Sequence, residues 1–334
     1  MKPIKPVLLE IQKPIVGNAD VASSEAIMVT TYSELQELIA QLSILNKRYV
    51  LYFRGQKEDY TSDDNAKKRK SSFYPTIFRG TLSSGESDIR WHKLDYASKR
   101  LVEEVVKEGL AKDNINILKR KHLLQWSILQ HYEVTGTPLI DVTQSLRVAC
   151  SFAMLNESLE NNDAWSYLYV FGLPYVNHRI SVDSEEYLTN IRLLSIAPAE
   201  AKRPYFQEGF LICEDVVQKE YVVKSELDLN NRLIAKFKIP RSINFWDCES
   251  IVPISTLYPI DDKIADVCQS IKTELDVVFN RDNHHALSKM ISADVIVESL
   301  CATMKLVLPF IILSKASWTL FSVLVSMFEV ASSI

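Results

Sequence analysis

The chain has 334 residues, of which 47% are hydrophobic and 24% charged, and its formal net charge is -4. This composition is that of a protein with a packed core, and it excludes intrinsically disordered and collagen-like chains, since there are only 8 glycines and 12 prolines. A protein that binds nucleic acid by neutralising phosphates is usually more basic, so such binding would need a local basic patch.

The cysteines and the N-terminus indicate a reducing, cytoplasmic compartment. Five cysteines are widely spaced, with no Cys-x-x-Cys pair or Cys/His cluster, so we expect buried free thiols and no metal site. The first twenty residues lack a long apolar run, which argues against a signal peptide.

The first expected elements are a helix and a strand. Residues 1–25 are interrupted by prolines and are expected to be extended. Thr31 or Ser33 can cap a helix, in which leucines and an isoleucine then recur at helical spacing. The β-rich run 49–53 predicts a short strand that ends at Arg54.

Further elements alternate between helix and strand. Amphipathic helices are expected over residues 90–108 and from the 120s to His131. Residues 137–142 and 165–171 predict strands, and Thr143 can cap a helix running through Ala153.

The remaining pattern completes an α+β prediction. Residues 178–240 indicate several short strands, and residues 261–278 an amphipathic helix. There is no regular βαβ period, so we expect a central mixed or antiparallel sheet of short strands with surrounding helices and a hydrophobic C-terminal helical tail. The predicted organisation comprises an extended segment, an α+β domain, a helical extension and a hydrophobic segment, over residues 1–25, 26–260, 261–303 and 304–334.

The tail contains a long apolar stretch, residues 306–328, whose only charge is Lys315. Its length could cross a bilayer, which would associate the protein with a membrane. A central lysine costs about 2.5–3.5 kcal/mol on insertion scales, so a buried helix or a partner-binding segment remains the alternative.

Three separated motifs carry the residues suited to a polar site. Arg54 precedes a glycine and can present a planar fork to phosphate or carboxylate. Asp141 and Thr143 alternate with apolar neighbours and so share one face of a strand, while His131 ends a helix whose dipole favours its charged form. Taken singly, Asp141 and Thr143 could instead cap a helix, and His131 could make a structural hydrogen bond.

Together these motifs resemble the FRG domain, a family named for its Phe-Arg-Gly motif. The resemblance covers roughly residues 27–215 and rests on four blocks, which read FRGQ from Phe53, FYPT from Phe73, LLQWSILQHYEVTGTPLIDVT from Leu123 and FQEGF from Phe206. It implies an accessory module of bacteria or phages, sometimes found in defence or toxin-like settings.

The order of the motifs is also similar, more loosely, to the three-part site of ADP-ribosyltransferases. That resemblance implies NAD as a substrate, with Arg54 at its phosphates or ribose and Asp141 and Thr143 at the polar strand. It places Gln207 or Glu208 at the position of the acid that stabilises an oxocarbenium-like state, and His131 as a general base or substrate contact. The other residues expected to bind NAD are Gly55, Gln56, Tyr74 and Tyr132.

Two departures leave the chemistry open. The polar strand lacks the usual Ser-Thr-Ser, and the residue that matches the family pattern at the acid position is the amide Gln207. The first hypothesis is therefore an ADP-ribosyltransferase-like effector that modifies a protein or nucleic-acid acceptor. The second is a non-catalytic module that binds a nucleotide, a phosphate or a partner. A nuclease or other hydrolase comes third, since no carboxylate cluster suits a metal. An acid facing Arg54 and Thr143 would favour catalysis, whereas Glu208 in solvent would favour binding.

Overall fold

A computed structural model describes residues 21–62, 70–80, 84–155, 159, 164–175, 178–183, 188–214, 229–247 and 249–279. The strands are β1 Ile27–Met28, β2 Val50–Gln56, β3 Thr61–Ser62, β4 Lys70–Ser71, β5 Ile140–Thr143, β6 Trp165–Leu173, β7 Ile180–Asp183, β8 Leu188–Arg192, β9 Gly209–Glu214 and β10 Leu233–Pro240. The α-helices are α1 Tyr32–Leu45, α2 Ser84–Lys107, α3 Ile115–Arg120, α4 His122–His131, α5 Leu146–Ala153, α6 Leu193–Ile196, α7 Arg203–Phe206, α8 Leu229–Arg232, α9 Ile254–Leu257 and α10 Lys263–Val278. Short 3₁₀ helices span Val21–Ser23, Thr76–Phe78 and Ile243–Trp246.

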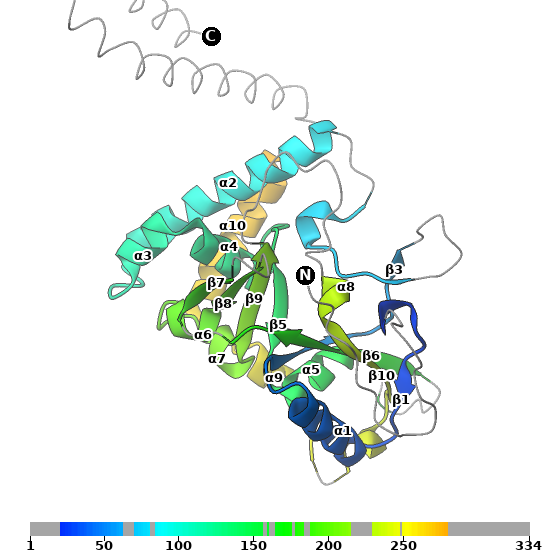
Figure 1. Ribbon diagram of the computed structural model, residues 1–334. Coiled ribbons are helices and arrows are strands. Elements are labelled where there is room, and N and C mark those ends of the chain that lie inside the picture. The colour runs from blue at the N-terminus through cyan, green and yellow to red at the C-terminus, as the bar shows by residue number, and fades with distance from the viewer. Residues whose placement is uncertain are drawn as a thin grey trace, which may run out of the picture. The chain divides into compact units, whose positions relative to one another are not determined.

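The centre of the fold is an eight-stranded sheet in the order β1-β10-β6-β2-β5-β9-β8-β7 (Figure 1). β1 runs parallel to β10, and the other neighbouring strands are antiparallel. β3 and β4 form a separate two-stranded sheet. The predicted α+β class and mixed sheet are confirmed.

Helices α1 and α5 cover one face of the sheet. Apolar residues of α1 recur every three or four positions, so that one side of the helix is apolar, and Leu35, Leu38, Ile39 and Leu42 are buried with residues of β2 and β6. Thr31 caps α1 by accepting a hydrogen bond from the backbone N–H of Glu34, 3.2 Å away. Thr31 is therefore the cap, and Ser33 lies inside the helix.

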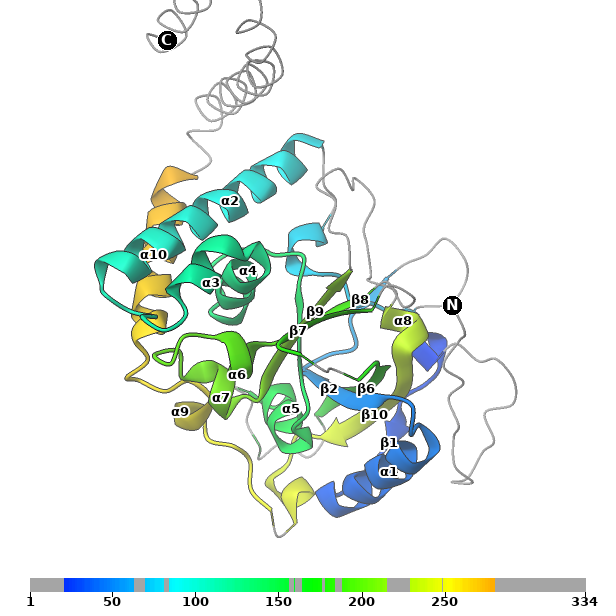
Figure 2. The same cartoon turned by 60° about the vertical axis from the view of Figure 1, so that its left-hand side comes forward.

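Four other helices pack together as a separate group. Figures 1 and 2 both show α2, α3, α4 and α10 lying together, apart from α1. Arg100 of α2 joins α10 through an ion pair of 3.0 Å with Glu274, which also accepts a hydrogen bond from Tyr96.

The sheet is nearly divided in two at its middle. β2 pairs with β6 over seven positions and β5 pairs with β9 over four, but β2 and β5 pair only at Phe53 and Thr143. One half of the sheet is therefore β1-β10-β6-β2 and the other is β5-β9-β8-β7, and we call the line between β2 and β5 the seam.

Several local predictions were wrong. The Phe53–Gln56 motif lies at the end of a strand as predicted, but β2 continues through the motif to Gln56 and does not end at Arg54, because β6 pairs with all three residues after Phe53. Residues 21–23, predicted as extended, form a 3₁₀ helix. The helix after β5 is capped at Ser145, while the hydroxyl of Thr143 accepts a hydrogen bond from the N–H of Ser145 and forms a turn.

The contacts within the chain define two units, residues 1–274 and 275–334. The described part of the second unit is the last turn of α10 and Phe279. The predicted boundaries at 260/261 and 303/304 stay predictions. No helix within the described ranges is long and apolar enough to span a membrane, and residues 306–328 lie outside those ranges.

Candidate functional site

A cavity of about 660 Å³ opens at the seam. Its walls come from β2 and the turn after it, residues 72–79, the end of α4, β5, α5, the start of β9 and Tyr258. Of the residues predicted for the site, eight line this cavity: Arg54, Gly55, Gln56, Tyr74, His131, Asp141, Thr143 and Gln207. The fold thus brings together segments more than 150 positions apart in the chain.

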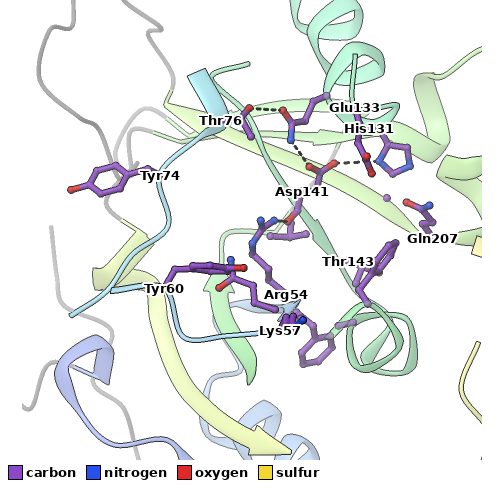
Figure 3. A pocket seen from close by; sticks show the side chains of 18 of the residues that line it. Arg54, Lys57, Tyr60, Tyr74, Thr76, His131, Glu133, Asp141, Thr143 and Gln207 are labelled. Carbon is purple, nitrogen blue, oxygen red and sulfur yellow. Dashed lines mark hydrogen bonds and ion pairs between the residues drawn. The ribbon is translucent and has the colours of Figure 1, made fainter. Parts of the chain in front are cut away.

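Arg54 crosses the seam. If β2 and β5 continued to pair beyond Phe53 and Thr143, Gly55 would lie opposite Asp141. The two backbones do not pair there. The Nη1 of Arg54 donates instead to the backbone oxygen of Asp141 at 2.6 Å (Figure 3). The side chain thus makes a hydrogen bond across the seam to the backbone of β5, and Arg54 lines the cavity.

Asp141 is the acceptor at the centre of a polar network (Figure 3). Gln130 Nε2 donates to its Oδ2 at 2.8 Å, and His131 Nδ1 lies 3.3 Å from its Oδ1. Thr76 and Thr137 both donate hydroxyl protons to Gln130 Oε1, at 3.0 and 2.7 Å. Burial opposes ionisation of Asp141, but the hydrogen bonds from His131 and Gln130 outweigh it and lower the pKa of Asp141.

Positive charge collects in the cavity. Arg54, Lys57 and Arg79 line it, as do two acids, Asp141 and Glu133. Burial lowers the pKa of Arg54 and of Arg79, and the nearby Asp141 carboxylate partly opposes the shift in both. Arginine stays charged in proteins, so the two guanidinium groups remain able to bind an anion.

The turn that carries Lys57 and Tyr60 into the cavity is anchored by a buried ion pair. Lys236 Nζ of β10 lies 2.9 Å from Asp59 Oδ2, and Tyr169 and Ser71 donate hydroxyl hydrogen bonds to Asp59 Oδ1 at 2.8 and 2.6 Å. Because both charges are paired and hydrogen-bonded, this pair can hold the turn in one place.

Aromatic rings provide the remaining surface, from Tyr60, Tyr74, Phe152 and Tyr258. Burial, with the charge of Glu133 second, raises the pKa of Tyr258 to about 12. Glu133 itself has a positive φ of 57° in the turn after α4. Rings of this kind suit the flat base of a nucleotide.

Gln207 and Glu208 point in different directions. Gln207 is buried, lines the cavity and donates through Nε2 to the backbone oxygen of Leu257 at 2.7 Å. Glu208 is exposed and does not line the cavity, because its backbone turns back at φ 45° before β9 begins. Within the described part of the chain, the cavity therefore carries an amide at the position where the looser resemblance expects an acid.

Tyr132 and Gly55 both make structural contacts, and of the two only Gly55 also lines the cavity. Tyr132 does not line the cavity. Its hydroxyl donates to Asp262 at 2.7 Å, and the guanidinium of Arg203 lies 4.8 Å above its ring. A Cβ on Gly55 would lie 1.9 Å from the backbone oxygen of Ala149, so this glycine allows the close approach of α5 to β2.

The sequence alone did not single out Lys57, Arg79, Gln130 or Tyr258 for the site. For Arg79 a signal was present, since Phe78-Arg79-Gly80 repeats the tripeptide of the first motif. For Tyr258 there was none, because it lies in the loop between α9 and α10 and reaches the cavity only through the fold. Within the described residues no cluster of His, Cys, Asp and Glu is suited to a metal ion.

Comparison with known families gives one match. Residues 49–162 match the family model of the FRG domain. This segment contains β2, the cationic residues of the cavity and the Gln130–His131–Asp141 network, whereas Gln207 and Tyr258 lie beyond it. Searches of curated proteins and of solved structures gave no match. Residues 49–162 of this chain are an FRG domain.

Proposed function

We propose that the cavity binds a phosphate-bearing nucleotide, with NAD as the first candidate, and that it binds this ligand without cleaving it. The observation that carries the proposal is the presence of Arg54, Lys57 and Arg79 around one cavity of about 660 Å³. Small-molecule sites have volumes of about 300–1,000 Å³ and combine apolar walls with a few polar groups that fix orientation. Phosphate oxygens are the natural partners of the two guanidinium groups.

Binding is favoured over ADP-ribosyl transfer because of the groups at the acid position. Cleavage of the bond between ribose and nicotinamide develops positive charge on the sugar, which a carboxylate stabilises. Gln207 carries no charge, and its amide nitrogen is held by Leu257. Glu208 is exposed to solvent and does not line the cavity, so its carboxylate does not face a sugar bound there.

ADP-ribosyl transfer remains the second candidate, because the acid Asp141 lines the cavity. Asp141 is the carboxylate nearest to Arg54, but its two oxygens accept hydrogen bonds from Gln130 and His131. A carboxylate held in this way positions its neighbours, and so it suits ligand recognition better than direct stabilisation of a sugar cation.

The test is titration calorimetry of the full chain with NAD, ADP-ribose and adenosine, with nicotinamide release followed in parallel. We expect saturable binding of NAD and ADP-ribose, at least tenfold weaker binding of adenosine, and no nicotinamide release. Arg79→Gln should weaken binding of NAD about tenfold, because a hydrogen bond to a charged group contributes about 1.5–3 kcal/mol.

The matched control is Arg48→Gln, which changes an exposed arginine outside the cavity and should leave binding unchanged. Equal affinity for adenosine and ADP-ribose would contradict the phosphate assignment. Release of nicotinamide by the wild type, and not by Arg79→Gln, would replace simple binding with cleavage of NAD, and ADP-ribose attached to an added acceptor would separate transfer from hydrolysis.

A further inference from the structure

The donors and acceptors of the polar network at the seam can be assigned from its backbone N–H groups, which only donate, and from the Asp141 carboxylate, which only accepts. The backbone N–H of Thr137 donates to the Thr76 hydroxyl at 2.9 Å, and the N–H of Leu139 donates to the Thr137 hydroxyl at 3.2 Å. Both hydroxyl oxygens therefore already act as acceptors from the backbone. Their protons can donate to Gln130 Oε1, at 3.0 Å from Thr76 and 2.7 Å from Thr137, and Thr76 also lies 3.3 Å from the backbone oxygen of Thr137.

The carboxylate of Asp141 fixes the orientation of the Gln130 amide. An ionised carboxylate only accepts hydrogen bonds, so Nε2 faces Asp141 and donates to Oδ2 at 2.8 Å, which leaves Oε1 facing the hydroxyls of Thr76 and Thr137. A flipped amide would place its N–H₂ against both hydroxyls and its oxygen against the carboxylate. Each hydroxyl oxygen has a second lone pair that can accept from the flipped amide, but an oxygen facing an ionised carboxylate makes no hydrogen bond, so the flipped arrangement loses the bond to Asp141.

The same reasoning extends to His131. An ionised Asp141 only accepts hydrogen bonds, so the nitrogen that lies 3.3 Å from its Oδ1 must carry a proton. That nitrogen is Nδ1. In a neutral imidazole the proton on Nδ1 leaves Nε2 as an acceptor.

Nε2 of His131 is an acceptor that makes no hydrogen bond to the described residues. The residue is 8% exposed and lines the cavity, and no described residue gives Nε2 a hydrogen-bond partner. Gly209 lies against this edge of the ring, since a Cβ there would be 2.9 Å from Cε1 and 3.4 Å from Nε2. A buried acceptor without a partner destabilises the protein, and a ligand that donates a hydrogen bond to it removes that penalty.

We infer that the network locks His131 in the Nδ1–H tautomer and that Nε2 accepts a hydrogen bond from a sugar hydroxyl of the bound nucleotide. This inference rests on the proposed function for its ligand. Arg54 contacts the backbone of Asp141 and His131 contacts its side chain, so a phosphate on Arg54 lies close to His131. In a nucleotide the hydroxyls of the ribose are only a few bonds from the phosphate.

The tautomer is tested without any ligand. In the full chain labelled with ¹⁵N-histidine, nitrogen shifts at pH 8 distinguish a protonated from an unprotonated ring nitrogen, and His131→Gln identifies the signals of His131 among the six histidines. We expect Nδ1 protonated and Nε2 bare. Nε2 protonated would overturn the inference and leave nucleotide binding itself untouched.

The hydroxyl is tested by combining a variant with altered ligands. Wild type, His131→Asn and His131→Gln are titrated with NAD and with NAD analogues that lack one ribose hydroxyl, after thermal melts establish that each variant is folded. For one analogue, wild type should bind about tenfold more weakly than it binds NAD. His131→Asn, whose amide can still donate to Asp141 but has no group in place of Nε2, should bind NAD and that analogue equally.

Two outcomes would contradict the hydroxyl assignment. If wild type binds NAD and every deoxy analogue with the same affinity, Nε2 meets another donor, such as the amino group of the base. If His131→Asn discriminates among the analogues as wild type does, His131 only positions Asp141. Loss of binding to NAD by wild type would instead count against the proposed function.

Discussion

At the scale of single residues, Gly55 combines two duties. Its backbone lines the cavity, and its missing side chain lets α5 lie against β2. The nearest atoms to a hypothetical Cβ are backbone atoms of Ala149 and Ala153, at 1.9 and 2.8 Å, which cannot rotate away.

We therefore expect Gly55→Ala to lower the free energy of unfolding by at least about 1–3 kcal/mol, the range for overpacking in a core. Chemical denaturation measures the change. The control is Gly85→Ala in α2, where nothing lies within 4 Å of the new Cβ. It should stabilise the protein by up to about 1 kcal/mol. Equal effects of the two substitutions would show that α5 can move away from β2.

The residues of the site were predictable to different degrees. Arg54, Asp141 and His131 stood out because charged or titratable groups beside short strands have few structural reasons to be there, and all three line the cavity. Glu208 was predicted as a candidate acid beside Gln207, but adjacent residues in a turn point to different sides and only the backbone angles decide which. Those backbone angles could not be derived from the sequence pattern.

At the scale of elements, one buried carboxylate joins three helices. Asp262 is fully buried and precedes α10, whose N–H groups at Ile264 and Ala265 it caps at 3.1 Å. It also accepts from the N–H groups of Lys202 and Arg203 at the start of α7, and from the hydroxyl of Tyr132 after α4. Burial and this hydrogen bond raise the pKa of Tyr132, which keeps its proton on the hydroxyl.

Asp262→Ala should lower the free energy of unfolding by at least about 2 kcal/mol, because it removes a cap and leaves buried donors without an acceptor. The adjacent Asp261→Ala should change it by less than about 0.5 kcal/mol, since Asp261 is exposed and pairs only with Lys202 among the residues described. Urea denaturation of both variants provides the comparison. A similar small loss in both would mean that other groups hold α7 and α10 together.

Elements with a clear period were predicted well. α1 and α10 lie within a few residues of their predicted bounds, and β6 was recognised from its alternation, whereas α2 begins at Ser84, well before its predicted start at residue 90. The four-residue helices α6, α7 and α8 were missed inside a region predicted as strands, because one turn of helix contains too few residues to show a period. Sheet order was also out of reach, since β10 pairs between β1 and β6 through contacts distant in sequence.

At the scale of the whole molecule, Asp141 links the two halves of the sheet. Its backbone binds Arg54 of β2, its carboxylate binds the end of α4, and β9 pairs with its strand. The ionised form is therefore stabilised by the fold, and the pKa of Asp141 lies below its ordinary value.

This lowered pKa predicts a dependence of stability on pH. Above the ordinary aspartate value, about 3.9, the contribution is fully present. As the pH falls through and below that value the unfolded chain takes up a proton first, so the free energy of unfolding decreases until the folded pKa is passed. Asp141→Asn should weaken this acid dependence in urea denaturation at pH 3–6, and Asp113→Asn, an exposed control, should not. Parallel curves for wild type and Asp141→Asn would place the acid sensitivity elsewhere.

The seam also bears on how the sequence encodes the cavity. The segment that matches the family supplies the cations and the histidine of the cavity, while the opposite wall at Gln207 and Tyr258 comes from residues outside it. The two walls of the cavity are thus separate stretches of sequence, and a substitution in one leaves the other unchanged. Under the proposed function, the wall inside the matched segment would hold the phosphate, and the wall outside it would contact the rest of the ligand.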